Sequence, residues 1–222
     1  MSIGKFSRLF LASIFLTLSA CTGFMDYPSA VFTVADDKLV LNGIIDDTTP
    51  DAFRNALSES PNVTALVLRF VPGSIDDESN LAVARAVRNA GLTTEVPSGG
   101  IVVSGGTDLF LAGKQRRLGQ GSCVGVHTWA EGLSGKAGAE YPRTSSEHQP
   151  YLDYYRDMAI DTEFYWFTLD AAGPEETHWM SRTEVDRFGM DTLGTGREAP
   201  LSSVDDCESR FSELWLELNS EG

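Results

Sequence analysis

The sequence has few of the residues that build a metal centre or a disulfide-rich scaffold. Among its 222 residues there are three cysteines and three histidines, and they form no Cys/His cluster. A structural zinc site needs four such ligands close together, so we expect neither a metal nor another cofactor. A chain of about 200 residues is long enough to bury a core without disulfides. The composition therefore favours one ordinary globular domain.

A long hydrophobic run occurs only at the N-terminus. Leu9–Leu18 is almost wholly apolar, follows the basic residues Lys5 and Arg8, and is followed by small residues and Cys21. The run is too short to span a membrane, and the order basic, apolar, small is that of a secretory signal. This N-terminus resembles a bacterial lipoprotein signal. The resemblance implies that Cys21 carries the lipid in the periplasm, and Thr22 favours the outer membrane.

An ordinary signal peptide with a nearby cysteine and an uncleaved anchor are the alternatives. In the lipoprotein interpretation, residues 1–20 are the signal peptide, 21–29 are a short tether and 30–222 are the folded domain.

Basic residues are also scarce. The chain has 17 lysines and arginines against 32 aspartates and glutamates, and loss of Lys5 and Arg8 with the signal leaves a formal charge of about −17. Such a surface repels nucleic acid and anionic lipid. A nucleic-acid partner is therefore not expected.

Two cysteines remain beyond the signal, Cys123 and Cys207. In an oxidising periplasm they could form one disulfide that joins a central strand to a C-terminal helix. The alternative is a pair of buried free thiols.

Apolar strands alternate with amphipathic helices along the rest of the chain. Strands are predicted at 30–34, 38–45, 63–70 and 93–96, up to Ser104, and at 115–118 and 122–127. Helices are predicted at 49–58, 76–90, 108–112, 148–172, 181–188 and 203–218. This order is typical of a parallel sheet with crossover helices. We therefore predict a single α/β domain with a parallel-rich sheet flanked by helices.

Two segments have an unusual composition. Ala130–Thr144 is rich in glycine, alanine and serine, and is predicted to be a mobile loop. The long helix at 148–172 places five large side chains near one side, namely Tyr151, Tyr155, Met158, Tyr165 and Leu169. A stripe of this kind is usually core or an oligomer contact, so a second copy of the chain is a candidate partner.

Two β-branched runs end on residues that can perform acyl transfer. Ile101–Val103 leads into Ser104, and the strand that begins near Cys123 ends at His127. A serine and a histidine at neighbouring strand ends can act as nucleophile and base. Gly105 follows Ser104 at a helix start, where backbone N–H groups can stabilise an oxyanion. The structural alternatives are a serine that caps a helix and a hydrogen-bonded core histidine.

Further motifs occur in the order seen in a known superfamily. A strand and the turn Pro72-Gly73-Ser74 precede the Ser104 segment, Gly125-Val126-His127 follows it, and Trp179-Met180-Ser181 comes last. Over about residues 63–190 the chain resembles the Clp-protease-like and crotonase-like superfamily, in particular the secreted Clp-like proteins of bacterial envelopes. The resemblance implies the Clp/crotonase-like version of the α/β fold predicted above.

The same resemblance assigns roles at the candidate site. It implies that Ser104 is the nucleophile and His127 the general base. It also implies that the backbone N–H groups of Gly73 and Gly105 form the oxyanion hole.

Two positions depart from the family's pattern. Pro72 stands where the family has the first of two glycines, and Thr177 stands where it has the triad aspartate. Threonine cannot hold an imidazolium as a carboxylate does. The nearby acids Glu175, Glu176 and Asp170 are left unassigned.

Three other residues have less defined expectations. His148 and His178 are expected at the surface or at helix ends rather than in catalysis. Asp108, four residues after Ser104, is either a buried hydrogen-bonding partner near the site or a helix cap.

The sequence thus predicts an envelope lipoprotein with serine-hydrolase, peptidase-like chemistry on a peptide or protein substrate, using Ser104 and His127. The alternative is a non-catalytic, degenerate Clp-like lipoprotein for binding or assembly. A third interpretation is an enzyme that acts on acyl thioesters, but the periplasmic address and the lack of a visible nucleotide site count against it.

Overall fold

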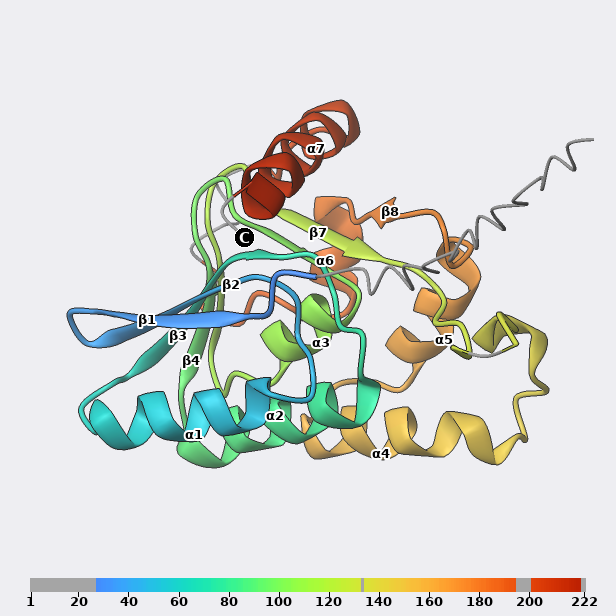
Figure 1. Ribbon diagram of the computed structural model, residues 1–222. Coiled ribbons are helices and arrows are strands. Elements are labelled where there is room, and N and C mark those ends of the chain that lie inside the picture. Colours follow the sequence, from blue (N-terminus) through green and yellow to red (C-terminus); the bar gives the residue numbers. More distant parts are fainter. Residues whose placement is uncertain (1–26, 133, 195–200, 221–222) are drawn as a thin grey trace, which may run out of the picture.

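A β-sheet with helices on both faces forms the centre of the protein (Figure 1). The computed structural model describes residues 27–132, 134–194 and 201–220. The predicted signal peptide and Cys21 lie outside the described residues. None of the described helices is long and apolar enough to cross a membrane.

Most strand pairings in the described sheet are parallel. The exceptions are the hairpin of the first two strands and the pairing of the last strand with its neighbour. The eight strands are β1 (Val31–Ala35), β2 (Lys38–Asn42), β3 (Ala65–Val71), β4 (Thr93–Val96), β5 (Ile101–Val103), β6 (Arg116–Leu118), β7 (Cys123–Val126) and β8 (His178–Trp179). The predicted α/β class with a parallel-rich sheet is confirmed.

The sheet divides at β3. One edge of β3 pairs with β2, and the other pairs first with β4, through Ala65–Val67, and then with β5, through Phe70 and Val71. β4 continues to β6, and β5 continues to β7. The chain bends between β4 and β5 at Gly99 and between β6 and β7 at Gly121, where φ is 71° and 66°. The division leaves the ends of β5 and β7 next to each other on one branch.

Helices cover both faces of the sheet. Figure 1 shows α1 and α2 against one face and α7 on the other. The helices are α1 (Thr49–Glu59), α2 (Asp77–Ala90), α3 (Gly105–Leu111), α4 (Gln149–Asp157), α5 (Glu163–Ala171), α6 (Arg182–Arg187) and α7 (Val204–Ser220), with short 3-10 turns at Gly138–Glu140 and Ser146–His148. The larger apolar core joins the sheet to α1–α6. A smaller one lies under α7, where Phe211 and Trp215 pack on Phe70, Ile101 and Trp179.

A disulfide fixes α7 to the sheet. Cys123 of β7 and Cys207 of α7 are bonded, with their Cα atoms 5.8 Å apart, which confirms the predicted pairing. The guanidinium of Arg210 donates to the carbonyl oxygens of Gly121 (2.7 Å) and Gly99 (3.3 Å). The cysteines are 84 residues apart in sequence. By its effect on unfolded-chain entropy, the bond contributes about 4 kcal/mol to stability.

The helix predicted at 148–172 is two helices, α4 and α5. Ala159 has a φ of 54°, which is incompatible with a continuing helix. Asp161 Oδ1 then accepts the N–H of Glu163 (2.9 Å) at the start of α5. Large side chains occur on both sides of the break between α4 and α5. Their spacing therefore predicted one continuous helix.

The helix predicted through 108–112 begins directly after Ser104, in agreement with the helix start expected at Gly105. Its first two residues, Gly105 and Gly106, have low helix propensity. A Cβ at Gly106 would lie 2.2 Å from the carbonyl oxygen of Val71. Glycine is therefore required for α3 to pack against β3.

Candidate active site

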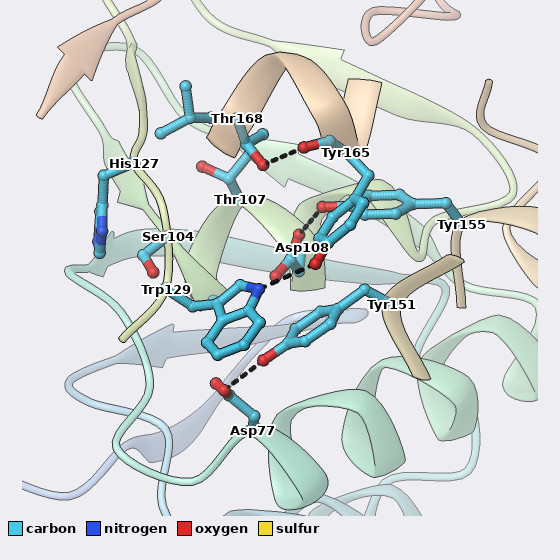
Figure 2. A pocket seen from close by; sticks show the side chains of 12 residues that line it. Asp77, Ser104, Thr107, Asp108, His127, Trp129, Tyr151, Tyr155, Tyr165 and Thr168 are labelled. Carbon is cyan, nitrogen blue, oxygen red and sulfur yellow. Dashed lines mark hydrogen bonds between the residues drawn. The ribbon is translucent and has the colours of Figure 1, made fainter. Parts of the chain in front are cut away.

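Parallel pairing of β5 with β7 brings Ser104 and His127 to the same edge of the sheet. Val103 pairs with Gly125, so Ser104 and His127 follow neighbouring strands at nearly the same height. Such strands lie about 4.8 Å apart. Both side chains line one cavity of about 40 Å³, which has room for a few water molecules. Other residues that line it are Asp77, Gly105, Asp108, Trp129, Tyr151, Tyr155 and Tyr165 (Figure 2).

The backbone of Ser104 has a conformation that glycine adopts far more readily. Its φ is 53° and its ψ is −122°, the values of the first central residue of a type II′ turn. Conformations of this kind cost about 1–3 kcal/mol. The carbonyl oxygen of Gly125 stabilises the conformation of Ser104, because it accepts hydrogen bonds from the N–H of Ser104 (3.1 Å) and the hydroxyl of Thr107 (2.8 Å). The Ser104 side chain makes no capping hydrogen bond to α3, so an N-cap role does not explain it.

Two backbone N–H groups beside Ser104, those of Gly73 and Gly105, have no hydrogen-bond partner among the described residues. Gly73 has a φ of 149°, and a Cβ there would lie 3.7 Å from the Cβ of Ser104. The Gly73 turn is held by Ile45, which donates to the carbonyl of Gly73 (3.0 Å) and accepts from the N–H of Ile75 (2.9 Å). Donors placed in this way can stabilise an oxyanion.

A backbone carbonyl orients the imidazole of His127. Its Nδ1 lies 2.8 Å from the carbonyl oxygen of Thr128. Nδ1 therefore carries the proton in the neutral ring, and Nε2 keeps its lone pair. Figure 2 shows the His127 ring and the Ser104 hydroxyl on the same side of the cavity, with no hydrogen bond drawn between them. Catalytic hydrogen bonds are often long until substrate binds.

Thr177 lies beside His127. β8, which the sequence did not predict, pairs with β7 so that Val126 is opposite His178. Continuing this register by one residue puts Thr177 opposite His127. A Cβ at Gly125 would lie 2.6 Å from the Thr177 methyl carbon, so the threonine packs directly on β7.

Acids near this position do not replace the triad aspartate in the part of the chain that is described. Asp170 forms an ion pair with Arg143 (3.7 Å). Glu175 and Glu176 are exposed and line an open groove together with His127, but the hydrogen bond of the ring goes to a main-chain oxygen instead. Over the same described residues, no group of three or more His, Cys, Asp or Glu side chains is placed to hold a metal ion.

The other two histidines have structural contacts. His148 lies at the start of α4, as a helix-end residue should, but it is completely buried rather than at the surface. Its Nδ1 lies 2.7 Å from the hydroxyl of Tyr165, which accepts the indole N–H of Trp129 (2.9 Å). His178 is partly exposed, with Nε2 3.0 Å from Glu184 Oε1. Neither histidine lines the cavity.

A row of four stacked aromatic rings passes the cavity, and three of them, Trp129, Tyr151 and Tyr165, line it. Tyr141, Trp129, Tyr151 and Tyr165 follow one another with centroid separations of 5.6, 5.7 and 5.4 Å. Tyr141 belongs to the segment 130–144 that was predicted to be a loop, and this segment packs over Trp129. The aromatic stripe predicted in 148–172 therefore contributes to the core and to the site.

Asp108 is one of two acids on the cavity wall, with Asp77. It lies on α3, four residues after Ser104, and Figure 2 shows it between Ser104 and Tyr155. Its Oδ1 accepts the hydroxyl of Tyr155. Burial raises the pKa of Asp108 to about 7; the Asp77 carboxylate acts in the same direction, and the hydrogen bond from Tyr155 opposes them. Asp108 is thus the hydrogen-bonding partner near the site, not a cap.

Neither a scan of protein-family models nor a search of curated proteins finds a match. Among solved structures, the chain is similar to a mutant of the membrane-bound stomatin-specific protease 1510-N in complex with a substrate peptide, with 14% identity, a TM-score of 0.47, and 75% of this chain and 77% of the other covered. It is also similar to an enoyl-CoA hydratase from Mycobacterium marinum (14%, TM-score 0.46, covering 87% and 95%). A third is methylmalonyl-CoA decarboxylase (10%, TM-score 0.46, covering 89% and 77%).

Because the TM-scores are below 0.5, these likenesses carry no argument about the family, activity or residue roles of this chain. The candidate site rests on its own geometry.

Replacing Ser104 by glycine should stabilise the protein. Ser104→Gly relieves the strain of a φ of 53°, and after allowance for glycine's larger unfolded-state entropy it should raise the free energy of unfolding by about 1 kcal/mol. Ser104→Ala removes the same hydroxyl but keeps the Cβ, so it should be no more stable than the wild type. Urea denaturation of the three proteins measures the difference. If the glycine variant were less stable than the alanine variant, the backbone of Ser104 would not be strained.

Asp108→Asn should change how stability depends on pH. With a pKa raised to about 7, Asp108 keeps its proton in the folded state while the unfolded chain loses it near pH 4, about its ordinary value. Its contribution to stability is therefore present at low pH and is lost as the pH rises through about 7. Relative to the wild type, the variant should gain about 4 kcal/mol between about pH 4 and 8.

Urea unfolding across that pH range measures this gain. Asp47→Asn, at an exposed position, is the matched control and should keep the wild-type pH dependence. If the difference in free energy of unfolding between Asp108→Asn and the wild type stayed constant with pH, the pKa of Asp108 would not be raised in the folded protein.

Proposed function

We propose that this protein is a lipid-anchored envelope hydrolase that cleaves peptide bonds through an acyl-enzyme on Ser104, with His127 as the base. The proposal is carried by the strained backbone of Ser104, which lies next to the unpartnered N–H groups of Gly73 and Gly105 among the described residues. His127 lines the same cavity. Strained residues concentrate at functional sites. The expected substrate is a peptide or protein, and this chemistry needs no cofactor.

Acylation is the first step. Oγ of Ser104 attacks the carbonyl carbon of the peptide bond while Nε2 of His127 takes the hydroxyl proton. The carbonyl oxygen becomes an oxyanion, and the N–H groups of Gly73 and Gly105 donate to it. One such donor is worth about 10²–10³-fold in rate. The C–N bond then breaks, the leaving amine takes the proton from His127, and an ester remains on Ser104.

Deacylation repeats these steps with water. The cavity of about 40 Å³ beside Ser104 and His127 can hold the water molecule. His127 takes a proton from this water as its oxygen attacks the ester carbonyl. The Ser104–acyl bond then breaks, the proton returns to Oγ, and the carboxylic acid product leaves.

The group that orients His127 sets the expected rate. The carbonyl of Thr128 selects the correct tautomer, but it carries no net charge and so stabilises an imidazolium less than a carboxylate does. In a Ser-His-Asp triad the aspartate both selects the tautomer and stabilises the imidazolium, and the Thr128 carbonyl matches it fully only in the first of these roles. We therefore expect slow turnover, with formation of the acyl-enzyme easier to detect than repeated cleavage.

A non-catalytic lipoprotein for binding or assembly is the second candidate. The threonine at position 177 beside His127, where the resembled family has its aspartate, favours it. In this case the same site would hold a peptide without cleaving it.

The anchoring part of the proposal rests on the N-terminal residues. A basic start, an apolar run and small residues precede Cys21, so lipid on that cysteine would hold the folded domain at a membrane face. Thr22 supports the outer membrane, with the domain in the periplasm.

A fluorophosphonate probe should label the wild type and fail to label Ser104→Ala. His127→Ala should lower the labelling rate by about 10²-fold or more, because the base that activates the hydroxyl is lost. Fluorescence of the labelled band against time measures both. Ser58→Ala, at an exposed serine of α1, is the control and should label like the wild type. A folded wild type that takes up no label would reject the hydrolase and leave the binding protein.

Cys21→Ser should release the protein from the membrane. The wild-type chain should incorporate a fatty-acid analogue and fractionate with the outer membrane, and the variant should do neither. A wild type that carries no lipid and stays in the soluble fraction would reject the anchor without affecting the hydrolase.

A further inference from the structure

A second space adjoins His127. It is an open groove of about 440 Å³, lined by Pro72, Val103, His127, Pro174, Glu175, Glu176, Thr177, Phe211 and Trp215. Among the described residues, His127 alone lines both this groove and the cavity that contains Ser104. A peptide held at Ser104 therefore has a second compartment next to the base.

Five of the nine residues that line the groove are apolar, and Glu175 and Glu176 add two exposed carboxylates. Pro72 comes from the turn before Gly73, and Val103 comes from the end of β5. The opposite wall is α7, whose Phe211 and Trp215 rings are stacked with centroids 6.1 Å apart and are only partly buried. A large apolar side chain placed here would remove these surfaces from water, which is favourable.

The α7 wall is fixed in place. Cys207, Phe211 and Trp215 are spaced by four residues, so the disulfide and both rings lie on one face of the helix. The bond to Cys123 and the hydrogen bonds of Arg210 to the sheet hold this face against β7. A preformed wall lowers the ordering cost of binding.

The proton transfer from His127 to the leaving amine indicates which part of a substrate would occupy the groove. In the proposed reaction His127 gives its proton to the leaving amine, which belongs to the residue after the cleaved bond. The groove contains His127 but not Ser104, whereas the cavity contains both. A groove beside the base but not beside the nucleophile is where the leaving-amine side of a substrate is expected.

We propose that this groove binds a large apolar side chain, such as phenylalanine, of the substrate residue that supplies the leaving amine. The assignment of sides rests on the proposed function, whereas binding of the side chain itself does not require cleavage.

Capture of the acyl-enzyme by added amines tests the leaving-amine side directly. The enzyme is acylated with an activated ester, and phenylalanine amide and glycine amide then compete with water. The amine nitrogen attacks the ester carbonyl and loses a proton to His127. An amide forms as the bond to Ser104 breaks, and Oγ takes the proton back from His127. Phenylalanine amide should be captured about tenfold more efficiently than glycine amide. Equal capture by the wild type would overturn the proposal.

Variants of α7 locate the effect. The acyl-enzyme of Trp215→Ala should be captured by the two amines with nearly equal efficiency. Trp215→Leu, which keeps an apolar side chain, should show an intermediate preference for phenylalanine amide. Leu216→Ala is the matched control, because Leu216 is 71% exposed and does not line the groove. It should keep the wild-type preference. An unchanged preference in Trp215→Ala would remove α7 from the site.

Binding to Ser104→Ala tests the groove without catalysis. Two peptides that differ only in one phenylalanine or alanine are titrated, and the indole N–H signal of Trp215 is followed by NMR. The phenylalanine peptide should bind about tenfold more tightly and shift that signal. Equal affinities would overturn the proposal whether or not Ser104 forms an acyl-enzyme. A clear phenylalanine preference with no fluorophosphonate labelling would instead reject the hydrolase and the assignment of sides, and keep the apolar groove.

Discussion

The carbonyl oxygen of Gly125 holds the candidate site in shape, because it accepts hydrogen bonds from the N–H of Ser104 and the hydroxyl of Thr107. This oxygen belongs to β7, the strand that leads to His127. The same strand therefore fixes the strained backbone of the serine and carries the histidine. A shift of β7 by one residue relative to β5 would break both hydrogen bonds and reverse the side-chain faces. Strand register, rather than loop conformation, sets the relation between the two residues.

The strands that lead to Ser104 and His127 could be predicted because Ile101–Val103 and Cys123–Val126 are apolar on both faces, as strands inside a parallel sheet usually are. Their adjacency could be expected from the alternation of strands and helices. The backbone conformation of Ser104 could not, because it depends on hydrogen bonds to a carbonyl about 20 residues away. A serine before a helix is also an ordinary cap.

Other parts of the site could hardly be predicted from the sequence. The group that orients His127 is a main-chain oxygen, that of Thr128, so a search for acidic side chains could not find it. The two residues of β8 are too few to show a period. The groove beside His127 depends on Phe211, far along the chain, and the Cys123–Cys207 pairing was the one sequence signal that connected the two regions.

α7 follows the site residues along the chain, and this order has a consequence for biosynthesis. Synthesis proceeds from the N-terminus, so Ser104 and His127 are made well before Trp215, and a nascent chain holds the serine and histidine while the groove still lacks its aromatic wall. The wall is locked in place only when Cys207 has met Cys123 in an oxidising compartment. The order of synthesis and the need for oxidation thus both delay completion of the groove until α7 has been made and Cys207 has been oxidised.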